Sequence, residues 1–528
     1  MQSLRSSHNR RNVDPVPPGV RPKLSAQRAT LLFGLPFFIA ACLYTVHLTS
    51  DLYGDEGSTF GVVSDGSFLA NLMSPQLCHP PLYFVAAKVC YVLTGRPWSI
   101  RLPSLLCALG TVVLVMRMAF RIYGRGVALL ALWLVALSPL LVEFAAEGRP
   151  YAMLAFFSTA LAYQLWCFLR HEDWKSMLLV SGYVAGGLLT HYIFVVHAAF
   201  AACYYLVRRR RFTKYSVGAL LIVSPVLVLL TLGLMHNAAQ SAELARHSPK
   251  QLSSLLNFLA RLPIALSFGF CTFRLPNLDF ARNVAAGVFR DNILMMIPMT
   301  LALIGLSLTM FRLLLRKREW VGFLLCSIVV PGVLLLLGVL GGCFVAREKY
   351  LIGVVGTYMV LVAVAFDGAR RSWKLRGIAV AYLLVVAVSL VHYTVYPNVY
   401  SRRMDWTGVR ELLHAEMAKG DALVFYRAES DATRQVGPDT EGIKIIDIQA
   451  EAQKGYDIAD IVGELAGVCL GRVFLVNNEI HRVYLDPRQQ VVHSLKKERS
   501  FERHDFGRNL SVYIFFPQRE HVSGDGKG

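Results

Sequence analysis

The sequence has few charged residues for its length. Of its 528 residues, 17% are Asp, Glu, Lys or Arg, whereas a soluble globular chain carries about 25%. Hydrophobic residues make up 55%, and the mean hydropathy is +0.46. The apolar residues come in blocks of roughly 20 with few charges, the length that crosses a bilayer. This pattern excludes an ordinary soluble domain and predicts a polytopic α-helical membrane protein.

Paired cysteines and nucleotide-binding motifs are also lacking. The ten cysteines are scattered, with no Cys-x-x-Cys and no His/Cys cluster at zinc spacing. The polar C-terminal part contains no Gly-x-Gly-x-x-Gly and no P-loop. No cofactor is therefore assigned, and dependence on a metal is left open.

The formal net charge is +19, but its placement argues against a nucleic-acid partner. Lys and Arg concentrate in short loops between apolar runs, which is what orients a chain in a bilayer. The strongest such run is Arg208–Arg211. Residues 1–28 are polar and basic, and we expect them to form a disordered cytoplasmic tail. Membrane lipids are the expected surroundings, in a cell inner membrane.

The charge pattern predicts about eleven spans within a transmembrane module at residues 29–397. The run at 81–93 is about 13 residues long, too short to span, so we expect an interfacial helix there. The first outer loop is then 49–101 and the second 236–291. The predicted spans are 29–48, 102–119, 127–142, 152–169, 177–190, 193–207, 217–235, 293–311, 321–340, 351–366 and 378–396.

The pattern changes at about residue 398. Short runs rich in β-branched and aromatic residues alternate with helical periodicity, which predicts a soluble α/β domain at 398–519 on the non-cytoplasmic side, followed by a polar tail at 520–528. The expected strands are 422–426, 443–448, 472–476 and 511–516, and the expected helices are 406–418 and 457–466.

Polar side chains collect in the loops predicted to lie outside. A carboxylate there suits a general base, because partial desolvation raises its pKa toward working pH. Arg and Lys suit a phosphate. A carboxylate base beside a cationic clamp, open to lipid, is what a transferase needs for a sugar carried on a lipid phosphate. The candidate residues are Asp55, Glu56, His79, Tyr83, Glu147, Arg149, Tyr151, His191, Arg347, Lys349 and Tyr350.

Each candidate also has a purely structural interpretation. Asp55 and Glu56 suit solvated loop acids, and His79 before Pro-Pro suits a helix cap. Glu147 and Arg149 suit a local ion pair at a span end. His191 suits a core histidine, the late-loop cations suit snorkelling to head groups, and the aromatic residues suit packing. Their shared position on one face favours the functional interpretation.

Several short motifs, in this order, resemble those of the multi-spanning GT-C glycosyltransferases. The resemblance is greatest to the bacterial protein mannosyltransferase-like clan, which includes lipid A aminoarabinose and galacturonic acid transferases, and it covers about residues 29–425. The motifs are Tyr53-Gly-Asp55-Glu56, His79-Pro-Pro-Leu-Tyr83-Phe84, Arg101-Leu-Pro-Ser104, Glu147-Gly-Arg149-Pro-Tyr151-Ala152, Arg347-Glu-Lys349-Tyr350-Leu351 and Asp405-Trp-Thr-Gly-Val409.

The resemblance implies an inverting transferase that uses a polyprenyl-phosphate sugar on the non-cytoplasmic face. Asp55 matches the family's catalytic base and Glu56 its acidic neighbour. Arg347 matches the cation that binds the lipid phosphate, with Lys349 as a second candidate because family members often have Arg and Tyr adjacent here. Arg149 and Tyr151 match the pocket lining. The sugar, the acceptor, whether lipid, glycan or protein, and the oligomeric state stay open.

Two other functions are weighed against an enzyme. A transporter or flippase of lipid-linked sugars would place charges at mid-span and show paired half-repeats, whereas this sequence has almost no mid-span charge and no such symmetry. A receptor or scaffold built on the outer α/β domain would leave the acidic first loop unexplained.

Overall fold

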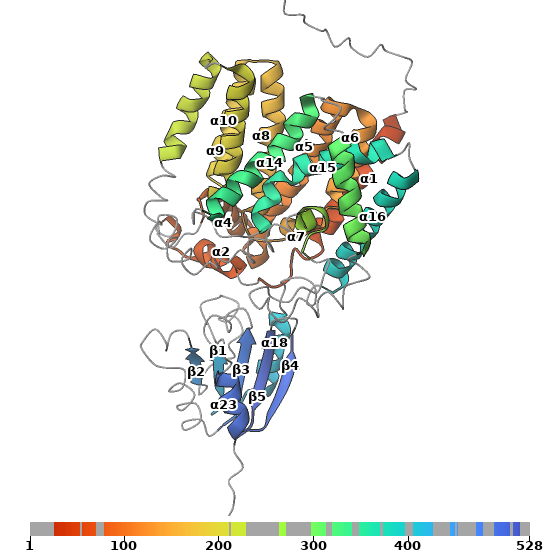
Figure 1. Cartoon of the computed structure of the whole chain (residues 1–528). Helices are drawn as coiled ribbons and strands as arrows, with labels where there is room; N and C mark the ends of the chain where they lie inside the picture. Colours follow the sequence, from red (N-terminus) through yellow and green to blue (C-terminus); the bar gives the residue numbers. More distant parts are fainter. Residues whose placement is uncertain are drawn as a thin grey trace, which may run out of the picture.

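A computed structural model describes two parts of the chain, a helical bundle and a smaller domain built on a sheet (Figure 1). The described residues are 26–52, 55–69, 79–210, 213–228, 263–270, 297–312, 319–340, 348–369, 373–396, 405–425, 444–448, 451, 471–478, 490–506 and 510–517. The expectations for most of the tail at 1–28, most of the loop at 236–291, Arg347, the helix at 457–466 and the tail at 520–528 lie outside these residues.

The bundle forms where the sequence is most apolar. Two further apolar helices, Lys214–Val228 and Ile297–Arg312, also lie in it. Its labelled helices are α1 (Ala26–Thr45), α2 (Asp55–Ser64), α4 (Leu82–Thr94), η1 (Pro97–Arg101), α5 (Leu102–Tyr123), α6 (Arg125–Ala136), α7 (Pro139–Ala145), α8 (Tyr151–Arg170), α9 (Trp174–Leu188), η2 (Tyr192–Phe194), α10 (Val195–Arg209), α14 (Glu319–Leu340), η4 (Glu348–Val354), α15 (Val355–Ala369) and α16 (Trp373–Val395).

The prediction of a polytopic helical membrane protein is confirmed. Among the described residues, five helices are long and apolar enough to cross a bilayer, or up to six if one bent pair counts as a single span. Each predicted span coincides at least in part with a described helix, but several of these helices are short, so the number eleven stays a prediction. The short helix predicted at 81–93 is present as α4, with 13 residues, and its position in the membrane interface stays a prediction.

The predicted span at 127–142 is wrong as a single helix. It breaks after Ala136 into α6 and α7, whose axes differ by 54°. Pro139 starts α7 at a position where its missing N–H costs no hydrogen bond, and the extended Ser138 precedes it. The bend brings the end of α7 to the turn at 146–150, which carries candidate residues.

Helix α15 lies inside the bundle rather than at the lipid. Within the segment Lys349–Gly368, 83% of the most apolar window is buried. A side chain on Gly356 would collide with Thr159 of α8, so the glycine lets the two backbones approach closely. Because η4 leads directly into α15, this contact helps to hold η4, which carries Lys349 and Tyr350, against α8.

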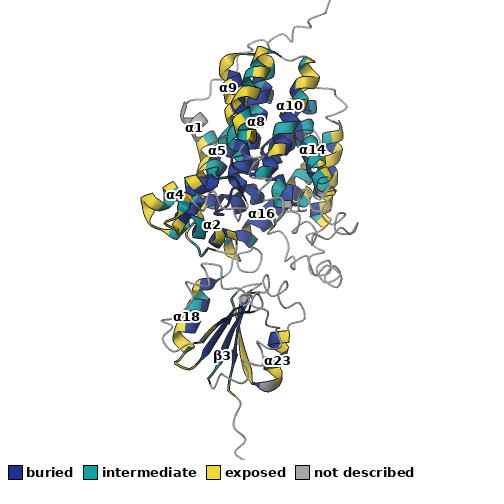
Figure 2. Cartoon of the chain, turned by 90° about the vertical axis from the view of Figure 1, so that its left-hand side faces the viewer, coloured by how far each residue is buried: buried dark blue, intermediate teal, exposed yellow. Residues whose placement is uncertain are grey.

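The small domain is a five-stranded sheet in the order β2-β1-β3-β5-β4. Strand β1 pairs in parallel with β2 and β3, whereas β5 is antiparallel to β3 and β4. Helices α18 and α23 cover opposite faces (Figure 2), each over its own apolar cluster. The elements are α18 (Trp406–Glu416), β1 (Ala422–Phe425), β2 (Lys444–Asp447), β3 (Val473–Asn478), α23 (Gln490–Glu498), β4 (Phe501–Asp505) and β5 (Leu510–Phe515).

All four predicted strands are present, and α18 coincides with the predicted helix at 406–418. The sequence interpretation missed α23 and β4. Strand β4 reads Phe-Glu-Arg-His-Asp and is mostly exposed, because edge strands carry charges that prevent further pairing. Such a strand lacks the alternating apolar signal on which the prediction depends.

The two parts touch through Asp51, which lies just before the candidate site. Its carboxylate accepts hydrogen bonds from the backbone N–H of Thr407 at 2.8 Å and from the Thr407 hydroxyl at 2.8 and 3.0 Å. Thr407 lies in the first turn of α18, where a negative charge is favourable. The contact ties the small domain to the loop that leads into α2.

Candidate active site

The floor of the site is a buried ion pair between Glu56 and Arg101. Both side chains are fully buried. The guanidinium donates from Nε to Glu56 Oε1 at 2.8 Å and from Nη2 to Oε2 at 2.6 Å. The backbone N–H of Gly148 also donates to Glu56 Oε1, at 2.5 Å. A side chain on Gly148 would meet Ile100 at 2.8 Å and Glu56 Oε1 at 3.2 Å, so glycine permits this approach.

The same guanidinium holds the turn that precedes α2. Nη1 donates to the carbonyl oxygens of Leu48 and Ser50 at 2.8 and 2.6 Å, and Nη2 donates to that of Asp51 at 2.7 Å. One arginine therefore fixes both the turn and, through Glu56, the first residues of α2. These are the contacts of a positioning residue, and the catalytic role expected for Glu56 beside Asp55 stays a prediction.

Asp55 is the first residue of α2. Its side chain is 55% exposed, and Oδ2 lies 3.3 Å from the Lys349 ammonium group. The desolvation expected for this carboxylate is therefore not observed. An exposed carboxylate next to a mostly buried ammonium group marks the entrance of the site.

Lys349 connects Asp55 to a cluster of rings. Its ammonium group lies 4.7 Å from the ring centroid of Tyr151, at the start of α8, within cation–π range. The Tyr151 ring lies 5.7 Å from that of His191, and His191 lies 5.5 Å from Tyr350. Four residues from α8, η4 and the start of η2 thus share one compartment.

Arg149 and His79 complete the compartment. The guanidinium of Arg149 donates to the Asp55 carbonyl at 3.1 Å, to the Thr59 hydroxyl at 3.2 Å and to His79 Nε2 at 2.7 Å. The rings of His79 and His191 are 4.7 Å apart. His79 does not cap α4, because the N-cap of that helix is Pro81 and no side chain caps it.

Each of the two histidines keeps one buried ring nitrogen without a hydrogen-bond partner in the described part of the chain. Because a guanidinium can only donate, His79 Nε2 is an acceptor and the ring proton lies on Nδ1. The backbone N–H of Ile193 donates to His191 Nδ1 at 3.1 Å, so the proton of that ring lies on Nε2. The atoms without partners are His79 Nδ1 and His191 Nε2, which are the two N–H donors, and buried donors of this kind suit a ligand.

Three comparisons with known proteins bear on this arrangement. Residues 78–232 match the family described as dolichyl-phosphate-mannose-protein mannosyltransferase. The fold matches the apo crystal structure of ArnT from Cupriavidus metallidurans with a TM-score of 0.51 and 14% identity, over 92% of this chain and 98% of that one. The chain therefore has the GT-C fold.

Two other GT-C structures are similar at lower scores. ArnT from C. metallidurans bound to undecaprenyl phosphate gives a TM-score of 0.49 at 13% identity, over 93% of this chain and 98% of that one. The oligosaccharyltransferase AglB from Archaeoglobus fulgidus, in complex with an inhibitory peptide and a dolichol-phosphate, gives 0.48 at 10% identity, over 94% and 75%. The search of curated proteins finds no match.

Within this GT-C fold, not every candidate residue faces the compartment. Tyr83 is fully buried in an apolar cluster, and its hydroxyl contacts the Ile100 carbonyl and the Ser104 hydroxyl at 2.8 and 2.9 Å. It packs α4 against η1 and α5, as its structural interpretation suggests. Glu147 is 3% exposed, in the turn that presents Gly148 to Glu56.

Arg101 is the residue of the GT-C site that sequence reasoning did not single out. It appeared only as part of a motif, although it begins an apolar run and has no acid nearby in the sequence. A cation in that position needs a partner from elsewhere in the chain. Among the described residues, no group of three or more His, Cys, Asp or Glu could hold a metal ion.

Burial and nearby cations keep both histidines neutral. Burial lowers the pKa of His191 to about 3, with Arg149 and Lys349 acting in the same direction. The pKa of His79 is likewise well below 6.5, first through burial and then through Arg149. Unfolded histidines bind protons below pH 6.5 while the folded ones do not, so folding stability is lost as the pH falls from about 6.5 toward 3.

We therefore expect the His191→Gln variant to lose less stability on acidification than the wild type. Between pH 7 and pH 5, His191 alone accounts for about 2 kcal/mol of the free energy of unfolding that the wild type loses. Unfolding of the purified protein in detergent at the two pH values measures the difference. His171→Gln, at an exposed position, is the control. Equal losses in the wild type and the His191→Gln variant would contradict the assignment of His191.

Proposed function

We propose that the protein is an inverting glycosyltransferase that moves a sugar from a polyprenyl-phosphate donor to an acceptor hydroxyl on the non-cytoplasmic face of the membrane. Asp55 is the general base. Three things support the proposal: the GT-C fold, the match of residues 78–232 to a mannosyltransferase family, and the compartment around Lys349. The activity named in that family's description is dolichyl-phosphate-dependent.

The observation that carries the proposal is the position of Lys349 between a carboxylate and a pocket of N–H donors. Its ammonium group contacts Asp55 at 3.3 Å and lies over Tyr151. Around it are Arg149 and the imidazole N–H groups of His79 and His191. A phosphate placed there meets one ammonium, one guanidinium and two neutral donors, which suits a dianionic leaving group.

The chemistry follows from these positions. Asp55 accepts the proton of the acceptor hydroxyl, whose oxygen attacks the anomeric carbon from the face opposite the phosphate. The bond from that carbon to the phosphate oxygen breaks, and its electron pair leaves with the polyprenyl phosphate. No general acid is needed, because the phosphate is a good leaving group and Lys349 balances its new charge. The attack from the opposite face inverts the configuration.

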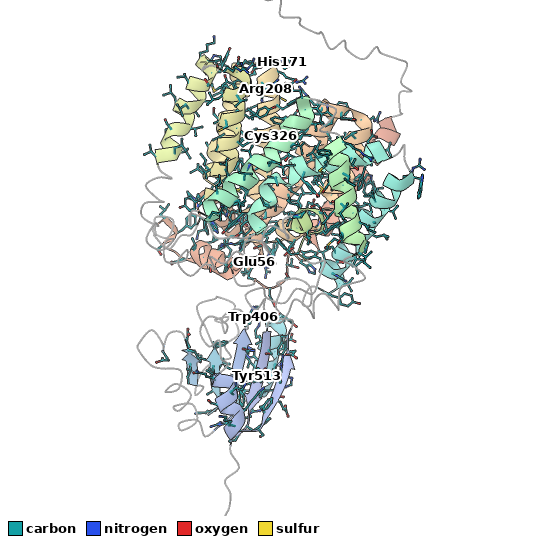
Figure 3. All side chains as sticks on the ribbon, in the orientation of Figure 1. Glu56, His171, Arg208, Cys326, Trp406 and Tyr513 are labelled. Carbon is teal, nitrogen blue, oxygen red and sulfur yellow. The ribbon has the colours of Figure 1, made fainter. Side chains whose placement is uncertain are left out.

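Transport fits this geometry less well. Transporter sites lie near the bilayer midplane between repeats. In this fold the candidate residues lie at the end of the bundle that faces the sheet domain, where Glu56 is labelled in Figure 3. Asp51 links that end to the small domain through Thr407. We propose that residues 398–519 form an extracytoplasmic domain over the site. We also propose that the chain lies in the inner membrane of the cell, with its N-terminus in the cytoplasm.

We expect Lys349→Met to weaken binding of the sugar donor more than it lowers kcat. Loss of one charge-assisted hydrogen bond to phosphate corresponds to about a tenfold rise in KM for the polyprenyl-phosphate sugar. The assay is consumption of labelled donor in membranes at several donor concentrations. Lys175→Met, at an exposed position outside the site, is the control. An unchanged KM would remove Lys349 from phosphate binding and leave Arg347 as the candidate.

The function as a whole is tested by mass spectrometry of glycolipids, glycans and proteins from a deletion strain and its parent. The strain that lacks the protein should lack one sugar modification, and the parental gene should restore it. The mass difference identifies the sugar, and the molecule that carries it identifies the acceptor. Identical profiles together with uptake of labelled lipid-linked sugar into vesicles would favour a transporter.

A further inference from the structure

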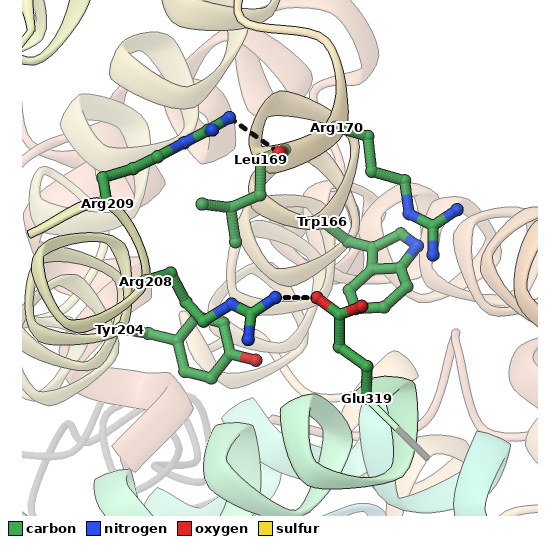
Figure 4. A pocket seen from close by; sticks show the side chains of 7 residues that line it. All are labelled: Trp166, Leu169, Arg170, Tyr204, Arg208, Arg209 and Glu319. Carbon is green, nitrogen blue, oxygen red and sulfur yellow. Dashed lines mark hydrogen bonds and ion pairs between the residues drawn. The ribbon is translucent and has the colours of Figure 1, made fainter. Parts of the chain in front are cut away.

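A polar cavity lies at the end of the bundle opposite the candidate site. In Figure 3 the labels His171 and Arg208 mark that end, whereas Glu56 marks the other. The cavity has a volume of about 80 Å³. It is bounded by the C-terminal ends of α8 and α10 and by the first residue of α14. Its lining residues are Trp166, Leu169, Arg170, Tyr204, Arg208, Arg209 and Glu319 (Figure 4).

The charges around this cavity are unbalanced. Three arginines line it, against the single carboxylate of Glu319, which pairs with Arg208 across the opening. Arg209 donates to the Leu169 carbonyl at 2.7 Å, and its Nε lies 3.7 Å from Glu172, too far for a hydrogen bond. That Nε is buried and has no hydrogen-bond partner among the residues described. Arg208 and Arg209 thus each have a carboxylate partner, and the excess positive charge of the cluster comes from Arg170.

Arg170 has the donors best placed for a ligand. Its guanidinium lies 4.6 Å from the ring centroid of Trp166. In the described part of the chain it has neither a hydrogen bond nor an ion pair. Stacking on an indole holds the planar guanidinium in place while its N–H groups stay available. This arrangement suits an oxyanion, whose oxygens an arginine holds two at a time.

The volume of the cavity and its position at the end of the bundle suit the phosphate of a lipid head group as its ligand. One water needs about 10–15 Å³ of such space, so the cavity holds roughly five waters, enough for a tetrahedral phosphate group. Trp166 and Tyr204 are residues typical of the membrane interface. Val207, beside Arg208, is 72% exposed and gives an acyl chain an apolar surface next to the cations.

We infer that this cavity binds a phosphate group at the membrane face predicted to be cytoplasmic, supplied by the head group of an anionic phospholipid. Arg170 and Arg208 hold the phosphate, and Glu319 competes with it for Arg208. Basic pockets between spans on that side of a membrane suit anionic head groups. The site is separate from the transferase compartment and does not depend on the function proposed for it.

The test is native mass spectrometry of the full-length protein in detergent with added phosphatidylglycerol, phosphatidylcholine or inorganic phosphate. We expect one saturable phosphatidylglycerol per chain at this site and no comparable binding of phosphatidylcholine. Arg170→Gln should weaken phosphatidylglycerol binding about tenfold. Glu319→Gln should strengthen it, because Arg208 loses its competing partner. Arg121→Gln, which removes an exposed arginine outside the cavity, is the matched control.

The opposite signs of these two variants separate a binding site from a merely structural cluster. If Arg170→Gln fails to fold, Glu319→Gln still decides the matter. Weaker binding in Glu319→Gln, or equal weakening in Arg121→Gln, would overturn the inference. Tight binding of inorganic phosphate that depends on Arg170 would overturn the lipid as the source and leave a soluble phosphate as the ligand.

Discussion

Asp55→Asn is expected to reduce sugar transfer by about 10²–10⁴-fold, the contribution of a positioned general base. The amide has nearly the same shape as the carboxylate but cannot accept the proton of the acceptor hydroxyl. The phosphate-binding groups stay in place, so donor binding should change little. Single-turnover consumption of labelled donor separates the two effects. Because Asp55 is 55% exposed and the Asn amide oxygen can still accept a hydrogen bond from Lys349, the fold should be little affected.

Asp65→Asn is the matched control. It makes the same change at an exposed position just beyond the C-terminal end of α2, outside the compartment, and should keep parental activity. Retained turnover in the Asp55→Asn variant would contradict the assignment of Asp55 as the base. Loss of turnover together with loss of donor binding would instead assign Asp55 to donor binding through Lys349.

Arg101→Met is expected to lower the free energy of unfolding by about 3–5 kcal/mol, as for other broken buried ion pairs. It leaves Glu56 charged and fully buried, and it removes the donors to the turn at 48–51. Arg101→Lys should recover only part of this loss, since an ammonium group cannot bind both carboxylate oxygens and three carbonyl groups in one plane. Chemical unfolding in detergent measures both variants.

The double variant Arg101→Met/Glu56→Leu separates pairing from packing. It removes both charges, so it should be more stable than Arg101→Met alone. Arg503→Ala breaks the exposed pair with Asp505 on β4, at 2.7 Å, and should cost less than about 1 kcal/mol. A loss of similar size for Arg101→Met and Arg503→Ala would show that the buried pair does not hold the site together.

Much of the fold could be predicted from the sequence because the signals are local. A run of apolar residues predicts a membrane helix wherever it stands, since the bilayer leaves no other way to satisfy the backbone. The α/β domain could also be predicted from a local signal, because its buried strands are short apolar runs. Predictions failed where the apolar signal was weak, as in the polar edge strand β4. They also failed where one apolar run holds two helices, as in the run that Pro139 divides into α6 and α7.

Most members of the candidate site could be predicted from the sequence, but not their roles. Charge placement put Asp55, Arg149, His191 and Lys349 on one face, and the structure brings them together. Sequence gives no measure of exposure, however, and the carboxylate expected to be desolvated proves to be the exposed one. Its neighbour Glu56, expected to share the chemistry, is instead held by an arginine 45 positions away.

The sequence by itself determined that this chain crosses a membrane, that an α/β domain follows, and which polar residues share a face, because hydropathy and charge act over neighbouring residues. Only the tertiary structure decided which contacts, and therefore which roles, each of those residues has. The pairing of Glu56 with Arg101, the direction of the free imidazole N–H groups and the arginine cavity at the far end all depend on contacts between distant helices. Such contacts depend on how helices pack, and no local pattern in the chain specifies them.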